Sequence, residues 1–424
     1  MRWIKVKLSG VMFLLLAVAA SAATTVYVSP IGNNTPPFDT WPKAATNIKA
    51  AIDVAANSDV VLVTNGNYLL TTQIVVTNGV TLRSVNGATL TTVDGQYPTL
   101  SNRCVYLSHT GAVLDGFTVI RGCTNGGVGG GGIWIGKGRA QNCTVVSNYS
   151  DANGGGIYLQ TGTVWNCVVT TNGAVGGGGG ICIENVGGGD TGAAVSNCVI
   201  QDNYTVGWGG GIYLIANGTI DSCVISNNHI SSSHLYGGGV LMGGYDGVQG
   251  GMLRNSLIVN NSSTLGGGGG VAVWRRAVIE NCTIVSNYCG GEWTVKGGGI
   301  CAGLFENPEP VSASLRNCII YANTCASSVA GNNYYLQYGA LLFTNCCALP
   351  LPATAGSTNN IAVDPLFDVN YRLHIRSPCI NAGTNQDWMT NALDLDGNTR
   401  ILNGIVDIGA YEKYLWHGTI IMVH

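Results

Sequence analysis

The sequence predicts an all-β protein: a right-handed parallel β-helix solenoid with a short N-terminal capping helix. The first indication is a recurring unit in which Asn-Cys, a few apolar residues and a second Asn precede a glycine run that closes on Ile or Val. It reads NCTVVSN…GGGIYL, NCVVTTN…GGGGGICI, NCVIQDN…GGGIYL and NCTIVSN…GGGICA. The second indication is the two-residue alternation of apolar and polar residues beside the glycines, which is typical of strands. Because a repeat of this length is typical of solenoids, we expect the units to stack coaxially as coils.

The repeats align on one column of small residues, 24 to 36 residues apart: Cys143, Cys167, Cys198, Cys223, Ser256, Cys282, Cys318 and Cys346. Two short strands per unit, always in the same chain direction, would stack into parallel sheets at about 4.8 Å per coil. The column then points inward, where a free Cys behaves as a small hydrophobe. We therefore interpret these cysteines as buried core residues rather than as redox or metal-binding groups.

Two columns of asparagine mark the bends of the predicted coil. The first directly precedes the cysteine column: Asn142, Asn166, Asn197, Ser222, Asn255, Asn281, Asn317 and Asn345. The second marks the next bend: Asn148, Asn172, Asn203, Asn228, Asn261, Asn287 and Asn323. Asn tolerates the left-handed conformation and bonds to nearby backbone, so the first column predicts a hydrogen-bonded ladder at a tight corner.

Residues 1–22 are predicted to be a secretory signal peptide. A positive stretch that includes Arg2 precedes the apolar run from Val11 to Ala20, and Ala20-Ser21-Ala22 is a small-residue cleavage site. The apolar run is too short for a comfortable membrane span, and no later segment replaces it. We therefore expect an exported protein with no membrane span.

Residues 23–347 are predicted to form the β-helix with its N-terminal cap. Ile48, Ala51, Ile52 and Ala55 fall on one face of a short amphipathic helix that would cover the first coil. Residues 348–424, where the repeat dissolves, are predicted to close the other end of the solenoid.

Composition excludes some classes of partner. Charged residues make up 10% of the chain and the net charge is -3, so no basic surface is available for nucleic acid. Hydrophobic residues make up 46%, which is ample for one continuous core. We expect a monomer whose surface is rich in Asn, Thr, Ser and Gly.

One column of charges is the candidate for catalysis. Asp221, Arg254, Glu280 and Arg316 lie just before the asparagine corner on four consecutive coils. Removal of a proton beside a carboxylate needs a cation that neutralises that carboxylate and a base that takes the proton. Arg254, Glu280 and Arg316 are therefore candidate catalytic residues. The alternative is a ladder of alternating charge that favours the correct register.

Aromatic residues are the candidates for substrate binding: Trp134, Tyr158, Trp165, Tyr213, Trp208 and Trp293. Three of them follow the first Ile of a glycine strand and should point outward, whereas Trp208 and Trp293 lie in loops before glycine runs. Their faces could stack on the sugar rings of a long polysaccharide. The alternative is that these rings stack on one another along the coils.

No residue pattern requires a cofactor, and a metal site is not predicted. Carboxylates on the inserts, Glu184, Asp190, Asp246, Glu306 and Glu309, offer weak Ca²⁺ binding as an alternative to simple solvation. The turn Asp394–Asp396–Asn398 resembles a calcium loop only superficially, because a downstream Glu at the right offset is missing.

The segments YVSPIGNN, WPKAATNIKAAID and VVLVTNGNY resemble the start of many secreted bacterial β-helix proteins of the pectin-lyase-like class. The segment DPLF…YRLHIRSPCINAG…DLDGNTRILNGIVDIGAYE is similar to the closing segment of the choice-of-anchor Q subgroup, and the VISNN…GGGVLM units are similar to repeats of polymorphic outer-membrane adhesins. Members of the subgroup usually continue into a surface-sorting tag, whereas KYLWHGTIIMVH follows Glu412 here. The resemblance implies a bacterial protein that is secreted or displayed on the outer cell surface.

Two hypotheses about function follow from these observations. The first is a secreted or cell-surface β-helix that binds polysaccharide or another surface, as an adhesin does, without an evident catalytic centre. The second is a polysaccharide lyase or hydrolase of the pectin-lyase-like class that acts on uronate-containing glycans. Fold alone does not decide between them.

Overall fold

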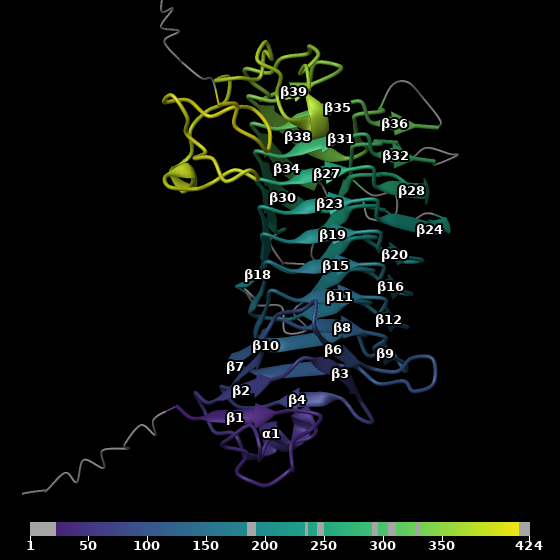
Figure 1. The fold of residues 1–424 in the computed structure, drawn as a ribbon. Helices are drawn as coiled ribbons and strands as arrows, with labels where there is room; N and C mark the ends of the chain where they lie inside the picture. Colours follow the sequence, from purple (N-terminus) through teal and green to yellow (C-terminus); the bar gives the residue numbers. More distant parts are fainter. Residues whose placement is uncertain are drawn as a thin grey trace, which may run out of the picture.

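Parallel strands stacked coil upon coil form a right-handed β-helix whose axis runs along the molecule (Figure 1). The structure is a computed structural model that describes residues 23–184, 192–233, 236–243, 250–290, 296–303, 311–326 and 331–414. The predicted signal peptide and Trp293 lie outside these residues. Thr144 pairs with Val168, which pairs in turn with Val199 on the following coil. Residues two to three dozen positions apart are thus neighbours, and the predicted fold class is confirmed.

A short helix lies at the N-terminal end of the solenoid, beside the first strands (Figure 1). This helix, α1, spans Ile48–Val54 and buries Ile48, Ala51 and Ile52. The side chain of Asn47 caps it by accepting a hydrogen bond from the Ala50 N–H at 2.8 Å. Within the described ranges, no helix has the length and apolarity needed to cross a lipid bilayer.

Each regular coil contains four short strands, not the two that the sequence predicts. The bends at the two asparagine columns divide the coil, so that the strands fall into three sheets. The second sheet has 11 strands: β3 Gly66–Leu69, β6 Thr91–Asp94, β8 Thr118–Ile120, β11 Thr144–Val146, β15 Val168–Thr170, β19 Val199–Gln201, β23 Val224–Ser226, β27 Leu257–Val259, β31 Thr283–Val285, β35 Ile319–Tyr321 and β39 Cys347–Ala348. The third sheet has eight: β9 Cys123–Thr124, β12 Tyr149–Ser150, β16 Gly173–Ala174, β20 Tyr204–Thr205, β24 His229–Ser233, β28 Ser262–Leu265, β32 Tyr288–Cys289 and β36 Thr324–Cys325.

The first sheet has 20 strands and divides into two stacks above its early coils. The early strands are β1 Thr25–Val28, β2 Val60–Val63, β4 Ile74–Val76, β5 Thr81–Ser84, β7 Val105–Asp115 and β10 Ile133–Gln141. The stack that follows the glycine runs, here the glycine stack, is β13 Ile157–Leu159, β17 Ile181–Ile183, β21 Ile212–Leu214, β25 Val240–Met242, β29 Val271–Val273, β33 Ile300–Ala302 and β37 Tyr334–Leu336. The stack before the cysteine corner is β14 Thr163–Trp165, β18 Ala193–Ser196, β22 Gly218–Asp221, β26 Met252–Arg254, β30 Arg276–Glu280, β34 Val311–Arg316 and β38 Gly339–Thr344.

The cysteine column lies in the core, as predicted. Every member from Cys143 to Cys346 is at most 2% exposed, and Ser256 in the same column is fully buried. The thiols donate to carbonyl oxygens of the previous coil, for example from Cys143 Sγ to the Leu114 oxygen at 3.8 Å. The seven cysteines of the column carry free thiols. The interpretation of the column as small core residues is confirmed.

The residues before the cysteines turn a left-handed corner, with φ between 48° and 55° from Asn142 to Asn345. The second asparagine column is the more regular ladder. In it, Asn172 Oδ1 accepts hydrogen bonds from both the backbone N–H and the side-chain amide of Asn148, each at 3.0 Å. The same pair of bonds repeats through every later member and ends on Asn333. These buried amides tie each coil to the next.

The segment after the last coil, here the tail (residues 364–414), lies beside the upper coils (Figure 1, yellow). It contains two short 3-10 helices, η1 (Val369–Tyr371) and η2 (Asp387–Met389). Four successive corner asparagines donate their amides to its carbonyl groups: Asn255 to Leu393, Asn281 to Asp407, Asn317 to Thr384 and Asn345 to Ala382. The corner column therefore holds the tail on the last coils, in addition to turning the chain.

Candidate functional site

A column of side chains lies on the outer face of the glycine stack. Tyr106, Trp134, Tyr158, Cys182 and Tyr213 occupy equivalent positions on successive coils. Their neighbours along each strand, such as Ile133 and Ile135 beside Trp134, belong to the solenoid core. The column therefore points outward, but loop side chains cover much of it.

The aromatic residues predicted to bind substrate differ in the exposure of their rings. Tyr158 is 5% exposed and Tyr213 is 3% exposed, so the expectation that they offer open faces is wrong. Trp134 is half-buried, with its ring 4.4 Å from that of Tyr158. Trp208 is also half-buried, and its ring stacks on Tyr236 and Trp274. Trp165 is exposed on the neighbouring stack.

Tyr158 and Tyr213 are buried because the rings of this column pack on one another, as in the alternative interpretation of the sequence. Apolar loop residues close over them, including Ile215 and Tyr236. The Tyr158 hydroxyl donates to Glu184 at 2.9 Å, which fixes that ring in place. An aromatic cluster covered in this way stabilises the glycine stack.

The charge column has the predicted register. Asp221, Arg254, Glu280 and Arg316 pair in order on four neighbouring strands. The Arg254 guanidinium donates twice to Asp221, at 2.8 and 2.9 Å. Arg316 forms an ion pair with Glu280 at 3.3 Å. The three candidate catalytic residues are thus divided between two ion pairs.

The tail covers this column. Arg254 lies 4.6 Å from the centre of the Trp388 ring, and Arg316 donates to Gln386 at 3.4 Å. Glu280, one of the three candidate catalytic residues, is only 4% exposed. A substrate could not approach its carboxylate without moving the tail.

The carboxylates considered for Ca²⁺ have other partners where the structure describes them. Glu184 accepts from Tyr158 and Asn153, and Asp396 forms an ion pair with Arg372. Asp190, Asp246, Glu306 and Glu309 lie outside the described residues. Among the residues that are described, His, Cys, Asp and Glu form no group of three or more that could hold a metal ion.

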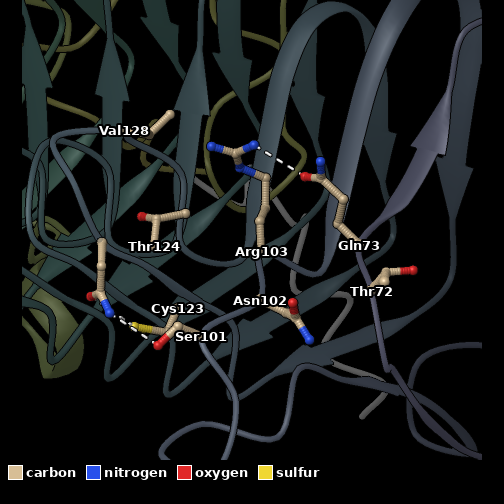
Figure 2. A pocket seen from close by; sticks show the side chains of 9 residues that line it. Thr72, Gln73, Ser101, Asn102, Arg103, Cys123, Thr124 and Val128 are labelled. Atoms are coloured by element: carbon tan, nitrogen blue, oxygen red, sulfur yellow. Dashed lines mark hydrogen bonds between the residues drawn. The ribbon is translucent and has the colours of Figure 1, made fainter.

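The early coils contain a pocket of about 330 Å³ that the repeat pattern does not reveal (Figure 2). Its lining residues are Thr72, Gln73, Ser101, Asn102, Arg103, Cys123, Thr124, Asn125 and Val128. Arg103 lies at the centre of this group, between Gln73 and Thr124 (Figure 2). The wall is rich in hydroxyl and amide groups and includes no acidic residue.

Three hydrogen bonds and an aromatic ring position the Arg103 guanidinium. It donates to the carbonyl oxygens of Gly130 at 3.0 Å and Gly129 at 2.7 Å, and to Gln73 Oε1 at 3.2 Å. It lies 4.9 Å from the centre of the Trp134 ring, within cation–π range. Guanidinium carries five N–H donors, so two remain free for a ligand.

The electrostatics of this pocket favour an anion. Burial lowers the pKa of Arg103, and Tyr106 partly opposes the shift, but arginine remains protonated in proteins. In the part of the chain that the structure describes, Arg103 forms no ion pair with a carboxylate. A half-buried positive charge without a counter-ion attracts anions, so an acidic ligand group would be stabilised there.

A row of exposed rings runs along the third sheet from this pocket. Tyr149 is the register partner of Cys123 in the pocket wall, and its ring stacks on Tyr97 at 6.1 Å. Two coils further on, Tyr204 and His229 stack at 5.9 Å. The Tyr204 ring lies over Gly173, where even a Cβ atom would be 2.2 Å from it. Tyr288 continues the row, and we call these residues the aromatic row (Tyr97, Tyr149, Tyr204, His229 and Tyr288).

Sequence reasoning missed Arg103 because it precedes the first regular repeat. The aromatic row had a signal, since Tyr149, Tyr204, His229 and Tyr288 each directly follow the second asparagine of a unit. This position opens a strand of the third sheet, which the prediction of two strands per unit did not include. Without the third sheet, the sequence could not place these aromatic residues side by side.

Comparison with known proteins agrees with the fold. No protein-family model matches the sequence, and no curated protein matches it. Among solved structures, the chain is similar to pectate lyase Pel9A, with a TM-score of 0.52 and 14% identity over 93% of this chain and 98% of that chain. It is also similar to a rhamnogalacturonan lyase, with a TM-score of 0.45 and 15% identity over 90% of this chain and 96% of that chain. The likeness to the pectate lyase shows a shared fold, the pectate-lyase-like parallel β-helix.

Proposed function

We propose that this protein binds an acidic polysaccharide, with Arg103 holding a carboxylate or another acidic group and the aromatic row receiving sugar rings. The Arg103 guanidinium carries the proposal, because it is fixed in an open pocket and has no acidic partner among the described residues. The row supports it, because four of its five rings are exposed, all but that of Tyr149, and successive rings on the third sheet lie one coil or more apart along the axis. A long polymer fits such an extended site better than a small ligand does.

The test is a binding series with polygalacturonate as the acidic probe and dextran as the neutral one. We expect Arg103→Met to bind polygalacturonate about 10- to 100-fold more weakly, as the loss of a charged hydrogen bond predicts. Arg103→Lys should recover only part of the affinity, because lysine keeps the charge without the planar fork. The matched control is Arg139→Met, since Arg139 is exposed and, among the described residues, its guanidinium bonds only to Thr163.

Affinity should also fall as salt is raised, because the anchoring contact is ionic. Equal affinities for polygalacturonate in the wild type and in a folded Arg103→Met variant would contradict the proposal. So would equal binding of dextran and polygalacturonate.

The second candidate is a lyase or hydrolase acting on uronate-containing glycans, with Arg254, Glu280 and Arg316 as its catalytic group. The register of these residues on three neighbouring strands favours it. The two ion pairs and the tail over Glu280 weigh against it. Unsaturated product from polygalacturonate or alginate, measured by ultraviolet absorbance and lost in both Arg254→Ala and Glu280→Ala, would establish this alternative.

A role outside the cytoplasm accompanies the binding proposal. The predicted signal peptide at residues 1–22 and the adhesin-like repeats support a bacterial protein that is secreted or displayed on the outer surface. The resemblance of the tail to choice-of-anchor Q proteins supports surface display. Fractionation of cells that express the full chain tests this point, and accumulation in the cytoplasm would contradict it.

A further inference from the structure

A cavity of about 450 Å³ lies where the tail meets the coils. The residues on the coil side that bear on its chemistry are Asn197, Arg254 and Asn255, and those on the tail side are Trp388, Leu393 and Asp394. The cavity shares no lining residue with the Arg103 pocket. Its volume falls within the range of small-molecule sites.

Two residues that line it, Asn255 and Trp388, each have a buried polar side-chain atom with no hydrogen-bond partner among the described residues. Asn255 is 1% exposed, and its amide nitrogen donates to Ser222 at 2.8 Å and to the Leu393 carbonyl oxygen at 2.7 Å. Its Oδ1 accepts no hydrogen bond, and the indole N–H of Trp388 donates none. Each unpaired buried polar group is costly, so a ligand hydroxyl that reached either atom after a small side-chain rotation would relieve that cost.

The charges around the cavity do not favour an anion. Asp221 neutralises Arg254, whose guanidinium also lies over the Trp388 ring. Asp394 is saturated by hydrogen bonds from Asp396, Asn398 and Glu412. Because the walls carry one positive and two negative side chains, the cavity has no excess positive charge for an acidic ligand.

Apolar side chains complete the wall on the tail side. Ala392, Leu393 and Leu395 line it beside the indole of Trp388. A surface that is apolar on one side and carries separate donors and acceptors on the other matches a sugar ring, which has C–H faces and hydroxyl edges.

We propose that this cavity binds one neutral sugar residue, whose hydroxyl groups reach Asn197, Asn255 Oδ1 and the Trp388 N–H after a small rotation of those side chains. Asn197 is exposed and its side chain forms no hydrogen bond with any residue that the structure describes, so it can take part. Since the walls come from both the tail and the coils, an occupant also stabilises the docked tail. This site is separate from the proposed acidic-polysaccharide site and does not depend on it.

The experiment uses the full mature chain with D-glucose, D-galactose, D-mannose and D-xylose as probes and D-galacturonate as the anionic comparison. Saturation-transfer NMR and titration report binding. We expect at least one neutral sugar to bind saturably and, in the Arg103→Met variant that lacks the proposed uronate anchor, D-galacturonate to bind more weakly. Trp388→Phe, which removes the N–H and keeps a ring over Arg254, should weaken binding about fivefold to tenfold.

Two further variants keep the test decisive if Trp388→Phe disturbs the tail. Asn197→Gly removes an amide that has no hydrogen-bond partner among the described residues. Glycine tolerates the left-handed corner at this position, where φ is 53°, so the variant should fold normally. It should bind the sugar several-fold more weakly. Trp41→Phe, a change at an exposed tryptophan near the N-terminal end, is the matched control and should bind like the wild type.

The inference is overturned if no neutral sugar binds saturably, which means that the cavity holds water only. It is also overturned if both Asn197→Gly and Trp388→Phe bind the sugar with wild-type affinity. Neither result affects polygalacturonate binding through Arg103, so failure of this inference and failure of the proposed function are distinguishable.

Discussion

Replacing one buried asparagine in the second column should cost the solenoid a large part of its stability. Asn228 is fully buried, and its side chain takes part in four hydrogen bonds. Asn228→Ala leaves the backbone N–H and the amide of Asn203 without their acceptor. With about 1–3 kcal/mol for each unsatisfied buried donor, the free energy of unfolding should fall by about 2–6 kcal/mol.

Equilibrium urea unfolding, followed by circular dichroism, measures this loss. Amide hydrogen exchange at Asn203 reports the local effect if the coils do not unfold together. The matched control is Asn227→Gly, because Asn227 is exposed, has a φ of 56° and forms no side-chain hydrogen bond with a described residue. It should stay within about 0.5 kcal/mol of the wild type. If Asn228→Ala is equally mild and leaves Asn203 protected, the ladder does not hold the coils together.

Three further predictions concern a glycine run, the tail and the aromatic row. Gly180→Ala should lower the melting temperature clearly, because the new Cβ would be 2.7 Å from the Gly211 carbonyl oxygen on the next coil; an unchanged thermal scan would contradict this packing. Burial raises the pKa of Glu412 from 4.5 to about 8 against the opposing effect of Arg400, so the folded state keeps a proton that the unfolded state releases. That contribution to stability is complete below about pH 4.5 and is lost as the pH rises to about 8. Glu412→Gln should therefore show a flatter dependence of melting temperature on pH across that window. Parallel curves for the variant and the wild type would be evidence against this role of Glu412. Tyr204→Ala should weaken polygalacturonate binding about twofold to tenfold, as the loss of one stacking ring predicts, and unchanged affinity would remove that ring from the site.

The spacing of cysteine and asparagine predicted the stacking of the coils because each coil repeats the same local problem. A small residue must face the core and an asparagine must take the left-handed corner, so Cys167 and Asn166 recur in the same order on coil after coil. The register of Arg254, Glu280 and Arg316 followed directly from that repeat. The repeat did not predict the number of strands per coil, because strands of two residues such as Tyr149–Ser150 are too short to show alternation.

Contacts between distant segments were beyond the reach of the sequence. The tail meets Asn255 through Leu393, a separation of 138 residues, and no periodicity links the two. The sequence also could not show that Glu280, a candidate catalytic residue, is buried as the ion-pair partner of Arg316. The burial of Tyr158 and Tyr213 has the same origin, since loops that differ from coil to coil close over them.

The most direct measurement of the proposed function is a hydrogen-exchange footprint of the protein with a saturating oligogalacturonate. We expect the ligand to slow amide hydrogen exchange around Arg103 and along the third sheet at Tyr149 and Tyr204, with no change at Arg254. Protection confined to the outer face of the glycine stack, or to the charge column beneath the tail, would contradict it.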